Sequence, residues 1–495
     1  MAIFCWIILC LTAGRNKIER KKNMKILKRT IALLLVVACA LVLVLCAACS
    51  DTGSIDAGKG ENGTQTETPE EGGNTGGGQT GESPVYDVSL SKTSYSLLLD
   101  DDLLSSLVLE ATAYTDGKAE PDARIEFSIA DETVAEVGTD GMLTAKAHGR
   151  TTVTASYCGE TATAEVLVYA SATEEQVNSF DEEYVRRFGR QYITSDGLNA
   201  DHVASGVEVT FYGTLLTAEI YASSAIYATI FVDGGEGSFT PLSSGKKTYT
   251  LASGMEEGIH TVRVLKSSEI YDGKLVFSSF GAERFLKPQK APELKIEFVG
   301  DSLTTGYGVL GNSGEGRTVQ NSDACSSFAY LTAQKLGADH SCVAIQGICV
   351  KAYHWQSSRN MEEMYAYVSP MHTQAHEPER DIDVIVLNLG TNDASYITTK
   401  NASYAEQFPE DYKEFLALIR SKHTNAYIIC TYGMMGENAS ISSGIDQAIE
   451  QLNDGKIIYL PSPVQNREGA NGHPNKAAHI AMANYLAEFI RMLPL

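Results

Sequence analysis

Apolar and polar residues follow two different patterns along this chain of 495 residues. From about residue 85 to residue 290, short runs with a period of two are separated by Gly and Asp turns, as in GVEVTFYGTLLTAEIYAS and GIHTVRVLKSSE. This alternation predicts β-strands, and no helical stretch of useful length interrupts it. We therefore expect two successive β-sandwich domains, over residues 85–170 and residues 171–290.

The pattern changes after Pro292, where continuous apolar runs begin to alternate with stretches of helical period. The expected strands are residues 294–299, 342–346, 382–389, 426–432 and 457–460. The expected helices are residues 326–337, 404–421, 440–453 and 475–492. Buried strands that alternate with helices predict an α/β domain over residues 291–495. Its parallel sheet should place a ligand crevice at the carboxyl ends of the strands.

The first 84 residues show neither pattern. Met24 opens a basic segment that leads into the apolar run IALLLVVACALVLVLCAACS, as in an export signal, and it is a better initiator than Met1. The ending LCAACSD resembles a bacterial lipobox, which would make Cys49 the lipidated residue within a signal region of residues 1–49. A plain transmembrane anchor is the alternative, because the run is near the ~20 residues that span a bilayer. Residues 50–84 are rich in Gly, Ser, Thr and Glu, which predicts a disordered linker.

The charge of the chain limits its partners. There are 39 Lys and Arg residues against 62 Asp and Glu residues, a net charge of −23. Residues 1–49 carry eight basic residues and one acid, so the remainder carries about −30. This balance argues against nucleic acid and favours neutral substrates. An exported, membrane-tethered chain is expected outside the cell, as a cell-surface lipoprotein if Cys49 is lipidated.

Cysteine and histidine give no sign of a metal site, and we expect neither a metal nor a cofactor. Five of the ten cysteines lie in residues 1–49, and the other five are sparse and without C-x-x-C spacing, which predicts buried free thiols. They are Cys158, Cys325, Cys342, Cys349 and Cys430. His372 and His376 are four residues apart, but the surrounding SPMHTQAHEPER is rich in helix breakers, so we expect loop residues there.

The stretch IEFVGDSLTTGYGVLG carries two motifs that indicate different chemistry. Gly306, Gly308 and Gly311 spell the G-x-G-x-x-G of a dinucleotide site, and residues 300–303 spell GDSL. A dinucleotide site needs its first Gly directly after the strand and an acidic residue about 20 positions on. The strand is expected to end near Val299, so Gly306 comes too late. No acidic residue closes a second strand about 20 positions on either, because NSDACSSF is typical of the start of a helix. We therefore favour the GDSL motif.

Within that motif Ser302 would lie one residue into the turn at the tip of the first strand, where a nucleophile is expected. The other strand tips offer the remaining parts of an acyl-transfer site. Gly347 follows VAIQ, Asn392 follows VLNLGT, and His473 lies in NGHPN before the last helix. His473 would act as the base, and the N–H groups of Ser302 and Gly347 with the Asn392 side chain would bind the oxyanion. Asp301 is expected to shape the turn.

Ser302, Gly347, Asn392 and His473, in this order, match the four blocks of the SGNH (GDSL) hydrolase superfamily. The resemblance covers residues 294–492 and implies a three-layer α/β domain of flavodoxin-like type. It is closer still to carbohydrate esterase family 2, whose members place a jelly-roll β-sandwich directly before the hydrolase domain. The segment YTLASGMEEGIHTVRVLKSSE resembles that sandwich. The earlier TVAEVGTDGMLTAKAHGRTTVTAS resembles bacterial immunoglobulin-like modules.

The chain departs from the superfamily beside the histidine. Most members carry an Asp two or three residues before it, whereas this chain has Asn471 and Ala470. Some members use a Ser-His dyad whose imidazole is oriented by a backbone carbonyl, for which Asn471 is the natural candidate here. Glu468 is the alternative acid. Trp355 would stack on a sugar ring or anchor the core.

The resemblance implies a monomeric acetyl esterase that removes O-acetyl groups from xylan, glucomannan and related plant polysaccharides. A surface glycan-binding or adhesin lipoprotein with a vestigial hydrolase domain is the alternative. A phospholipid or thioester hydrolase is disfavoured, because long acyl chains need an apolar channel and TTGYGVLGNSGEG offers small polar residues. His479 falls in the last helix and is expected to be structural.

Overall fold

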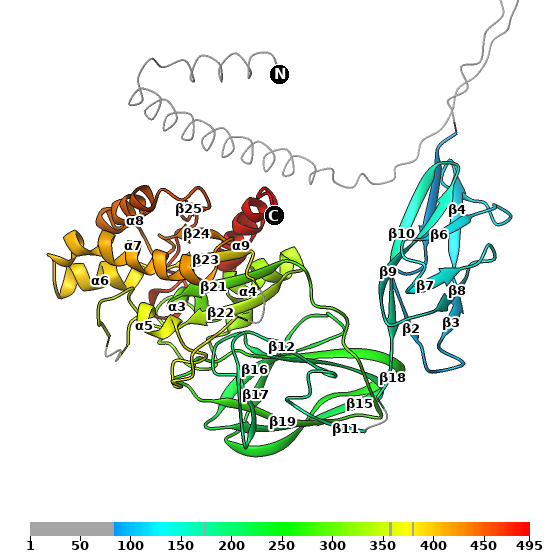
Figure 1. Cartoon of the computed structure of the whole chain (residues 1–495), viewed down its shortest axis with the longest axis horizontal. Coiled ribbons are helices and arrows are strands. Elements are labelled where there is room, and N and C mark those ends of the chain that lie inside the picture. Colours follow the sequence, from blue (N-terminus) through cyan, green and yellow to red (C-terminus); the bar gives the residue numbers. More distant parts are fainter. Residues whose placement is uncertain (1–83, 173–174, 356–358, 379–380) are drawn as a thin grey trace, which may run out of the picture. The chain divides into compact units, whose positions relative to one another are not determined.

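The structure is a computed structural model that describes residues 84–172, 175–355, 359–378 and 381–495 (Figure 1). The expected signal region, the candidate lipidation residue Cys49 and all but the last residue of the expected linker lie outside these ranges. Among the described residues, no helix combines the length and the apolar character that crossing a membrane requires.

The first described region consists of short strands, as its alternation predicted. The strands are β1 (Tyr86–Leu90), β2 (Ser94–Leu98), β3 (Ser106–Val108), β4 (Ala111–Thr115), β5 (Lys118–Ala119), β6 (Glu126–Ile129), β7 (Ala135–Val137), β8 (Met142–Ala145), β9 (Gly149–Tyr157) and β10 (Glu160–Tyr169). They form three sheets, in the orders β1-β4-β5, β2-β10-β9-β6 and β3-β8-β7. Alternate residues of β9 and β10, such as Val153 and Val166, are buried in one apolar core.

The second region is also built of strands, and two long ones dominate it. The strands are β11 (Gln176–Asn178), β12 (Val185–Phe188), β13 (Tyr192–Thr194), β14 (Gly197–Asn199), β15 (Gly206–Ala222), β16 (Ile226–Val232), β17 (Ser238–Leu242), β18 (Gly245–Lys266), β19 (Leu275–Gly281) and β20 (Arg284–Leu286). β15 and β18 pair antiparallel along most of their length. The register between β15 and β18 shifts near Gly213. Before this point the opposite edge of β15 pairs with β12 and β20, and after it with β19.

The third region contains a parallel sheet in the strand order β22-β21-β23-β24-β25. Its strands are β21 (Lys295–Gly300), β22 (Asp339–Ala344), β23 (Val384–Asn388), β24 (Tyr427–Thr431) and β25 (Ile457–Tyr459). The helices are α3 (Ser302–Thr305), η1 (Ala324–Ser326), α4 (Phe328–Leu336), α5 (Met361–Tyr365), α6 (Thr391–Thr399), α7 (Tyr404–Lys422), α8 (Ala439–Leu452), η2 (Ala470–Gly472) and α9 (Lys476–Arg491). All five predicted strands and four predicted helices are therefore confirmed to within a few residues.

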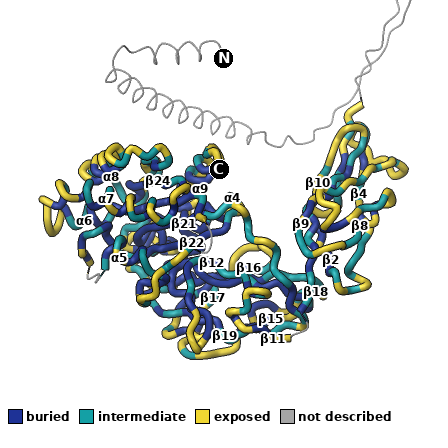
Figure 2. The backbone as a smooth tube through the Cα atoms, in the orientation of Figure 1, coloured by how far each residue is buried: buried dark blue, intermediate teal, exposed yellow. Residues whose placement is uncertain are grey.

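Successive residues of the central strands face opposite sides of this sheet. Phe298 packs with Phe328 of α4 and Leu486 of α9, whereas Val299 packs with Phe415 of α7 and Ile445 of α8. Helices thus cover both faces, and the sheet runs buried between them (Figures 1 and 2). Burial on both faces explains the continuous apolar runs of the sequence. A strand that is buried on both sides does not alternate between apolar and polar residues.

The second and third regions share a buried polar contact. Arg190, just after β12, bonds Glu297 of β21 with Nη2 and Oε1 2.9 Å apart, and both side chains are almost fully buried. The Tyr365 hydroxyl donates to the same carboxylate at 2.7 Å. Removing one partner of such a pair leaves an unpaired buried charge, which costs about 3–5 kcal/mol. This contact helps to fix the nucleophile strand relative to the preceding domain.

Two expectations about single residues need correction. Cys158 is exposed and not buried, because it lies in the tight turn between β9 and β10 with a φ of 49°. The other four cysteines of the described residues are buried and free, as expected. Trp355 is not a core anchor, since its side chain is 61% exposed.

Candidate active site

The nucleophile candidate lies at the tip of the central strand β21. Asp301 caps the amino end of the short helix α3, and its carboxylate accepts a hydrogen bond from the Leu303 N–H at 3.0 Å. Ser302 is the first residue of this helix, so no carbonyl of the helix pairs with its N–H. Asp301 therefore shapes the turn, as expected. Burial raises the pKa of its carboxyl to about 7.

The glycines after Ser302 serve the packing of this loop. Gly306 ends α3 with a φ of 71°, and a Cβ added there would lie 2.1 Å from the Asp323 carbonyl oxygen. Gly308 has a φ of 67°, and its added Cβ would lie 2.7 Å from the carbonyl oxygen of Ala470. The G-x-G-x-x-G spacing thus lets the nucleophile loop lie against the loop that carries the histidine, a structural use that agrees with rejecting a dinucleotide site.

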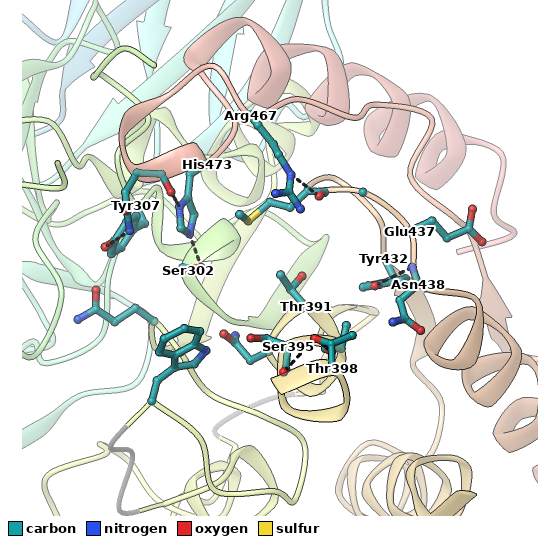
Figure 3. A pocket seen from close by; sticks show the side chains of 18 of the residues that line it. Ser302, Tyr307, Thr391, Ser395, Thr398, Tyr432, Glu437, Asn438, Arg467 and His473 are labelled. Atoms are coloured by element: carbon teal, nitrogen blue, oxygen red, sulfur yellow. Dashed lines mark hydrogen bonds between the residues drawn. The ribbon is translucent and has the colours of Figure 1, made fainter. Parts of the chain in front are cut away.

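His473 lies within hydrogen-bonding distance of Ser302. Its Nε2 is 2.9 Å from the Ser302 Oγ, and its Nδ1 is 3.2 Å from the backbone carbonyl oxygen of Asn471 (Figure 3). The carbonyl can accept only from a protonated Nδ1, which leaves Nε2 free to take the serine proton. Burial lowers the pKa of His473 to about 4, against a smaller opposite effect of the Asn471 carbonyl. The imidazole is therefore neutral at physiological pH.

Tyr307 is a site residue that the sequence analysis missed. Its ring lies against the His473 imidazole with the centroids 4.2 Å apart, and its hydroxyl accepts from the Asn471 side-chain amide at 3.1 Å. Figure 3 shows the two rings side by side above Ser302. The sequence held one signal, an aromatic residue between two glycines of the nucleophile loop, but nothing in it indicated a partner 166 positions away.

The structure also brings both remaining oxyanion candidates to this pocket. Gly347 has a φ of 76°, and its added Cβ would lie 3.2 Å from the Cβ of Trp355. Asn392 lies in the first turn of α6, and its Nδ2 is 3.0 Å from the Ile348 carbonyl and 3.3 Å from the Asp301 carboxylate. These contacts hold the amide at the pocket wall. The roles of the Ser302 N–H, the Gly347 N–H and the Asn392 amide as oxyanion donors stay predictions.

The pocket around Ser302 has a volume of about 890 Å³, and its walls combine polar and apolar side chains. Small polar side chains of α6 form the lower wall in Figure 3, and the segment after β24 forms another. Trp355 and Tyr271 are the exposed aromatic residues of the lining, with 61% and 53% of their surface accessible. Further lining residues are Gln346, Thr391, Ser395, Thr398, Tyr432, Met435, Asn438 and Arg467.

Several other candidates do not join the site. Glu468 accepts hydrogen bonds from the side chains of Asn466 and Asn475, at 2.9 Å each, and the Nδ1 of His473 bonds the Asn471 carbonyl instead. His479 is buried in α9, where its Nδ1 accepts from the Phe328 N–H.

The two histidines of the SPMHTQAHEPER segment lie in a loop, as expected. His372 stacks on Tyr192, and the His376 N–H donates to the Ala366 carbonyl. The described part of the chain contains no group of three or more His, Cys, Asp or Glu residues arranged to hold a metal ion.

Two family models match this part of the chain. Residues 296–486 match the model of the GDSL-like lipase/acylhydrolases, and residues 188–292 match that of the carbohydrate esterase 2 N-terminal domain. With the serine and histidine in contact at the strand tip, these matches define the class: a carboxylic-ester hydrolase domain of the SGNH (GDSL) superfamily. More particularly, the chain combines this hydrolase domain with a carbohydrate esterase 2 N-terminal domain.

Individual relatives agree with this assignment. The chain is 30% identical over 303 residues to the cellulase/esterase CelE of Acetivibrio thermocellus, a match that covers 58% of this chain and 36% of that protein. It is 24% identical over 322 residues to an acetylxylan esterase/glucomannan deacetylase of Cellvibrio japonicus, covering 63% of this chain and 89% of the relative. The chain thus spans only about a third of the length of the first relative, because CelE is much longer.

One solved structure is similar to this chain in both sequence and fold. It is that of a family two carbohydrate esterase from Clostridium thermocellum in complex with cellohexaose. The sequence identity is 28%, the TM-score is 0.58, and the match covers 62% of this chain and 98% of the other.

Proposed function

We propose that this protein is an extracellular, lipid-anchored carbohydrate esterase that hydrolyses O-acetyl groups of plant polysaccharides or oligosaccharides such as xylan or glucomannan. The observation that carries the proposal is the chain of contacts from the Ser302 Oγ through the His473 imidazole to the Asn471 carbonyl, in the wall of a pocket of about 890 Å³. Such a contact chain is the hydrogen-bonding pattern of an activated serine nucleophile.

In the proposed reaction, the His473 Nε2 takes the proton of Ser302 while its Oγ attacks the acetyl carbonyl carbon. The N–H groups of Ser302 and Gly347 stabilise the oxyanion of the tetrahedral intermediate, to which one such donor typically contributes a few kcal/mol. The intermediate collapses to an acetyl-serine, and the protonated His473 donates its proton to the departing sugar hydroxyl. Water, deprotonated by the same imidazole, then attacks the acetyl-serine and releases acetate.

The Asn471 carbonyl replaces the carboxylate of a full triad in this proposal. It holds the Nδ1 proton, and with it the ring orientation and tautomer, but it supplies no full negative charge to the imidazolium. The Tyr307 ring, inclined at 34° to the imidazole, adds a second constraint on it. Orientation is therefore provided by backbone and aromatic contacts, which favours an active enzyme over a vestigial hydrolase domain.

The pocket supports a small acyl group on a carbohydrate. The wall that α6 contributes carries small polar side chains such as Ser395 and Thr398, whereas a long acyl chain would require an apolar channel. The exposed Trp355 ring offers a flat surface on which a sugar ring can stack. The acidic chain, with a net charge of −23, favours a neutral polysaccharide. Relatives named acetylxylan esterase and glucomannan deacetylase act on substrates of this kind.

The test is acetate release from acetylated xylan and acetylated glucomannan by the purified protein, with Ser302→Ala as the control. We expect release by the wild type and none by the variant. Binding of both polysaccharides without acetate release from either, or from 4-nitrophenyl acetate, would contradict the proposal and favour the glycan-binding or adhesin function.

The proposed location rests on the sequence of the signal region. We infer that Cys49 is lipidated and tethers a monomeric enzyme to the outer face of the bacterial membrane. Fractionation of cells that express Cys49→Ala tests this, because the variant should be released or keep an uncut signal. A cleaved and membrane-bound variant would contradict it.

We also infer the finer fold classes from the sheet patterns. The antiparallel strands before residue 290 suit two β-sandwiches, an immunoglobulin-like module followed by a jelly roll. The parallel order β22-β21-β23-β24-β25 corresponds to 2-1-3-4-5, the order of flavodoxin-like sheets.

A further inference from the structure

A loop of the second region reaches the residues that surround the nucleophile. It comprises residues 267–272, directly after β18, and has the sequence SSEIYD. Its Tyr271 lines the pocket together with Ser302. The Ser267 carbonyl accepts from the Ala324 N–H at 3.1 Å, which joins the beginning of the loop to the hydrolase domain.

Asp272 fixes the other end of this loop. Its carboxylate forms a two-pronged ion pair with Arg317, whose Nε donates to the Ser322 hydroxyl at 3.1 Å. That hydroxyl in turn accepts from the Gly308 N–H at 3.0 Å. The loop is thus linked through three side chains to the backbone of the nucleophile loop.

Glu269 lies between these two anchors and contacts the strand end that carries Gly347. Its Oε1 accepts from the Gln346 N–H at 3.1 Å, and only 2% of the residue is exposed. The preceding Ile345 N–H donates to the Gly300 carbonyl at 3.3 Å. The segment that leads to Gly347 is therefore held on one side by the nucleophile strand and on the other by Glu269.

We propose that Glu269 is a positioning residue for the oxyanion-binding N–H of Gly347, so that the amino-terminal domain supplies part of the esterase site. Gly347 has a positive φ and no Cβ, so its backbone has wide conformational freedom. The residue itself therefore does not fix the direction of its N–H. The Glu269 contact, one residue earlier, removes part of that freedom. Preorganised donors stabilise an oxyanion because they need no reorientation during the reaction.

The chemistry of the contact identifies a substitution that should preserve it. Burial raises the pKa of Glu269 to about 7, with Lys266, Asp272 and Arg317 as its charged neighbours. The contact with the Gln346 N–H needs an acceptor oxygen and not a negative charge. An amide in place of the carboxyl keeps such an oxygen, whereas a methionine side chain of similar length offers none.

The experiment measures kcat and KM of Glu269→Gln and Glu269→Met for 4-nitrophenyl acetate. The inference, like this assay, rests on the proposed esterase function. We expect Glu269→Met to lose roughly tenfold in kcat with little change in KM. The loss should be smaller than the roughly 10²- to 10³-fold loss for a removed oxyanion donor, because Glu269 acts on that donor indirectly. Glu269→Gln should stay within about threefold of the wild type, because it keeps the acceptor oxygen.

The matched control is Glu208→Gln, which weakens the ion pair with Arg263 elsewhere in the same domain, with the Arg263 Nη2 and Glu208 Oε2 2.7 Å apart. It should leave kcat unchanged. Equal kcat values for folded Glu269→Gln and Glu269→Met would overturn the inference, and so would a Met variant that fails to fold, since that outcome assigns Glu269 a structural role. A wild type inactive on every acetyl ester would contradict the proposed function instead.

Discussion

The ring of Tyr307 lies against the imidazole of His473, with the two centroids 4.2 Å apart. Tyr307 belongs to the nucleophile loop, and its hydroxyl also accepts from the side chain of Asn471, whose carbonyl orients His473. One aromatic residue therefore contacts both the base and the residue that orients it. In the proposed mechanism, this arrangement takes the place of a carboxylate two or three residues before the histidine.

The ring contact with His473 predicts a graded response to substitutions of Tyr307. Tyr307→Phe keeps the ring and should retain kcat/KM within about threefold, because only the contact with the Asn471 side chain is lost. Tyr307→Ala removes the constraint on the imidazole and should lower kcat/KM by roughly 10- to 100-fold, since small misplacements of reacting groups have effects of this order. Both values are measured on 4-nitrophenyl acetate. Equal activity of the Ala variant and the wild type would show that the ring does not position His473.

The fall of kcat/KM on the acid side of the pH profile should occur at an unusually low pH. The base must be neutral to accept a proton, and burial lowers the pKa of His473 to about 4. The value of kcat/KM should hence stay level at pH 6 and fall only as the pH decreases through about 4. An ordinary histidine, with a pKa near 6.5, would already be largely protonated at pH 6.

Arg467 provides a check on that assignment. Its positive charge disfavours the imidazolium and is one cause of the low pKa of His473. Arg467→Gln should therefore move the acid limb to higher pH. An acid limb near pH 6.5 in the wild type, or no shift in the variant, would contradict the described surroundings of the imidazole.

The backbone carbonyl of Asn471 should tolerate changes of its side chain. Asn471 has a φ of 53°, which Gly adopts at no steric cost, so Asn471→Gly keeps the carbonyl in place and should retain most of the activity. Glu468→Gln should also be mild, because Glu468 bonds Asn466 and Asn475. A large loss of kcat/KM in Glu468→Gln beside a near-normal Asn471→Gly would replace the dyad by a displaced triad.

Trp355 should matter for polysaccharides and not for small esters. The exposed indole lines the pocket beside Gly347, whereas the proton transfer takes place between Ser302 and His473. Trp355→Ala should raise KM for acetylated xylan or glucomannan by roughly tenfold, as expected for the loss of one stacked ring worth about 1 kcal/mol or more. KM and kcat for 4-nitrophenyl acetate should not change. Equal effects on both substrates would indicate a structural role.

The main elements of the hydrolase domain could be predicted because they are strongly patterned. Each strand of the parallel sheet is buried on both sides and therefore forms an apolar run, as in the KIEFVG of β21. The helix α6 could not be predicted, since TNDASYITT is polar and β-branched and has no clear apolar face. It forms where Gly390 turns the chain after β23, and tertiary contacts override its weak propensity.

The residues of the candidate site also fall into two groups, those that could be predicted from the sequence and those that could not. Ser302, Gly347, Asn392 and His473 could be located because each follows a predictable strand or precedes a predictable helix. Tyr307 and Glu269 could not, because their partners lie 166 and 77 positions away and only the folded chain brings them together. A Tyr in a glycine loop and a Glu at a strand end are common in surface turns, so neither residue type indicates a site by itself.

The central claim is that Ser302 and His473 act as one catalytic unit. It is tested most directly by kcat/KM on 4-nitrophenyl acetate for Ser302→Ala, His473→Ala and the double variant. Each single variant should lose several orders of magnitude, and the double variant should be no slower than the slower single one, because removing either member already disables the pair. Activity within about tenfold of the wild type in either single variant would contradict the account, since removing one member of a catalytic unit should abolish most of the activity.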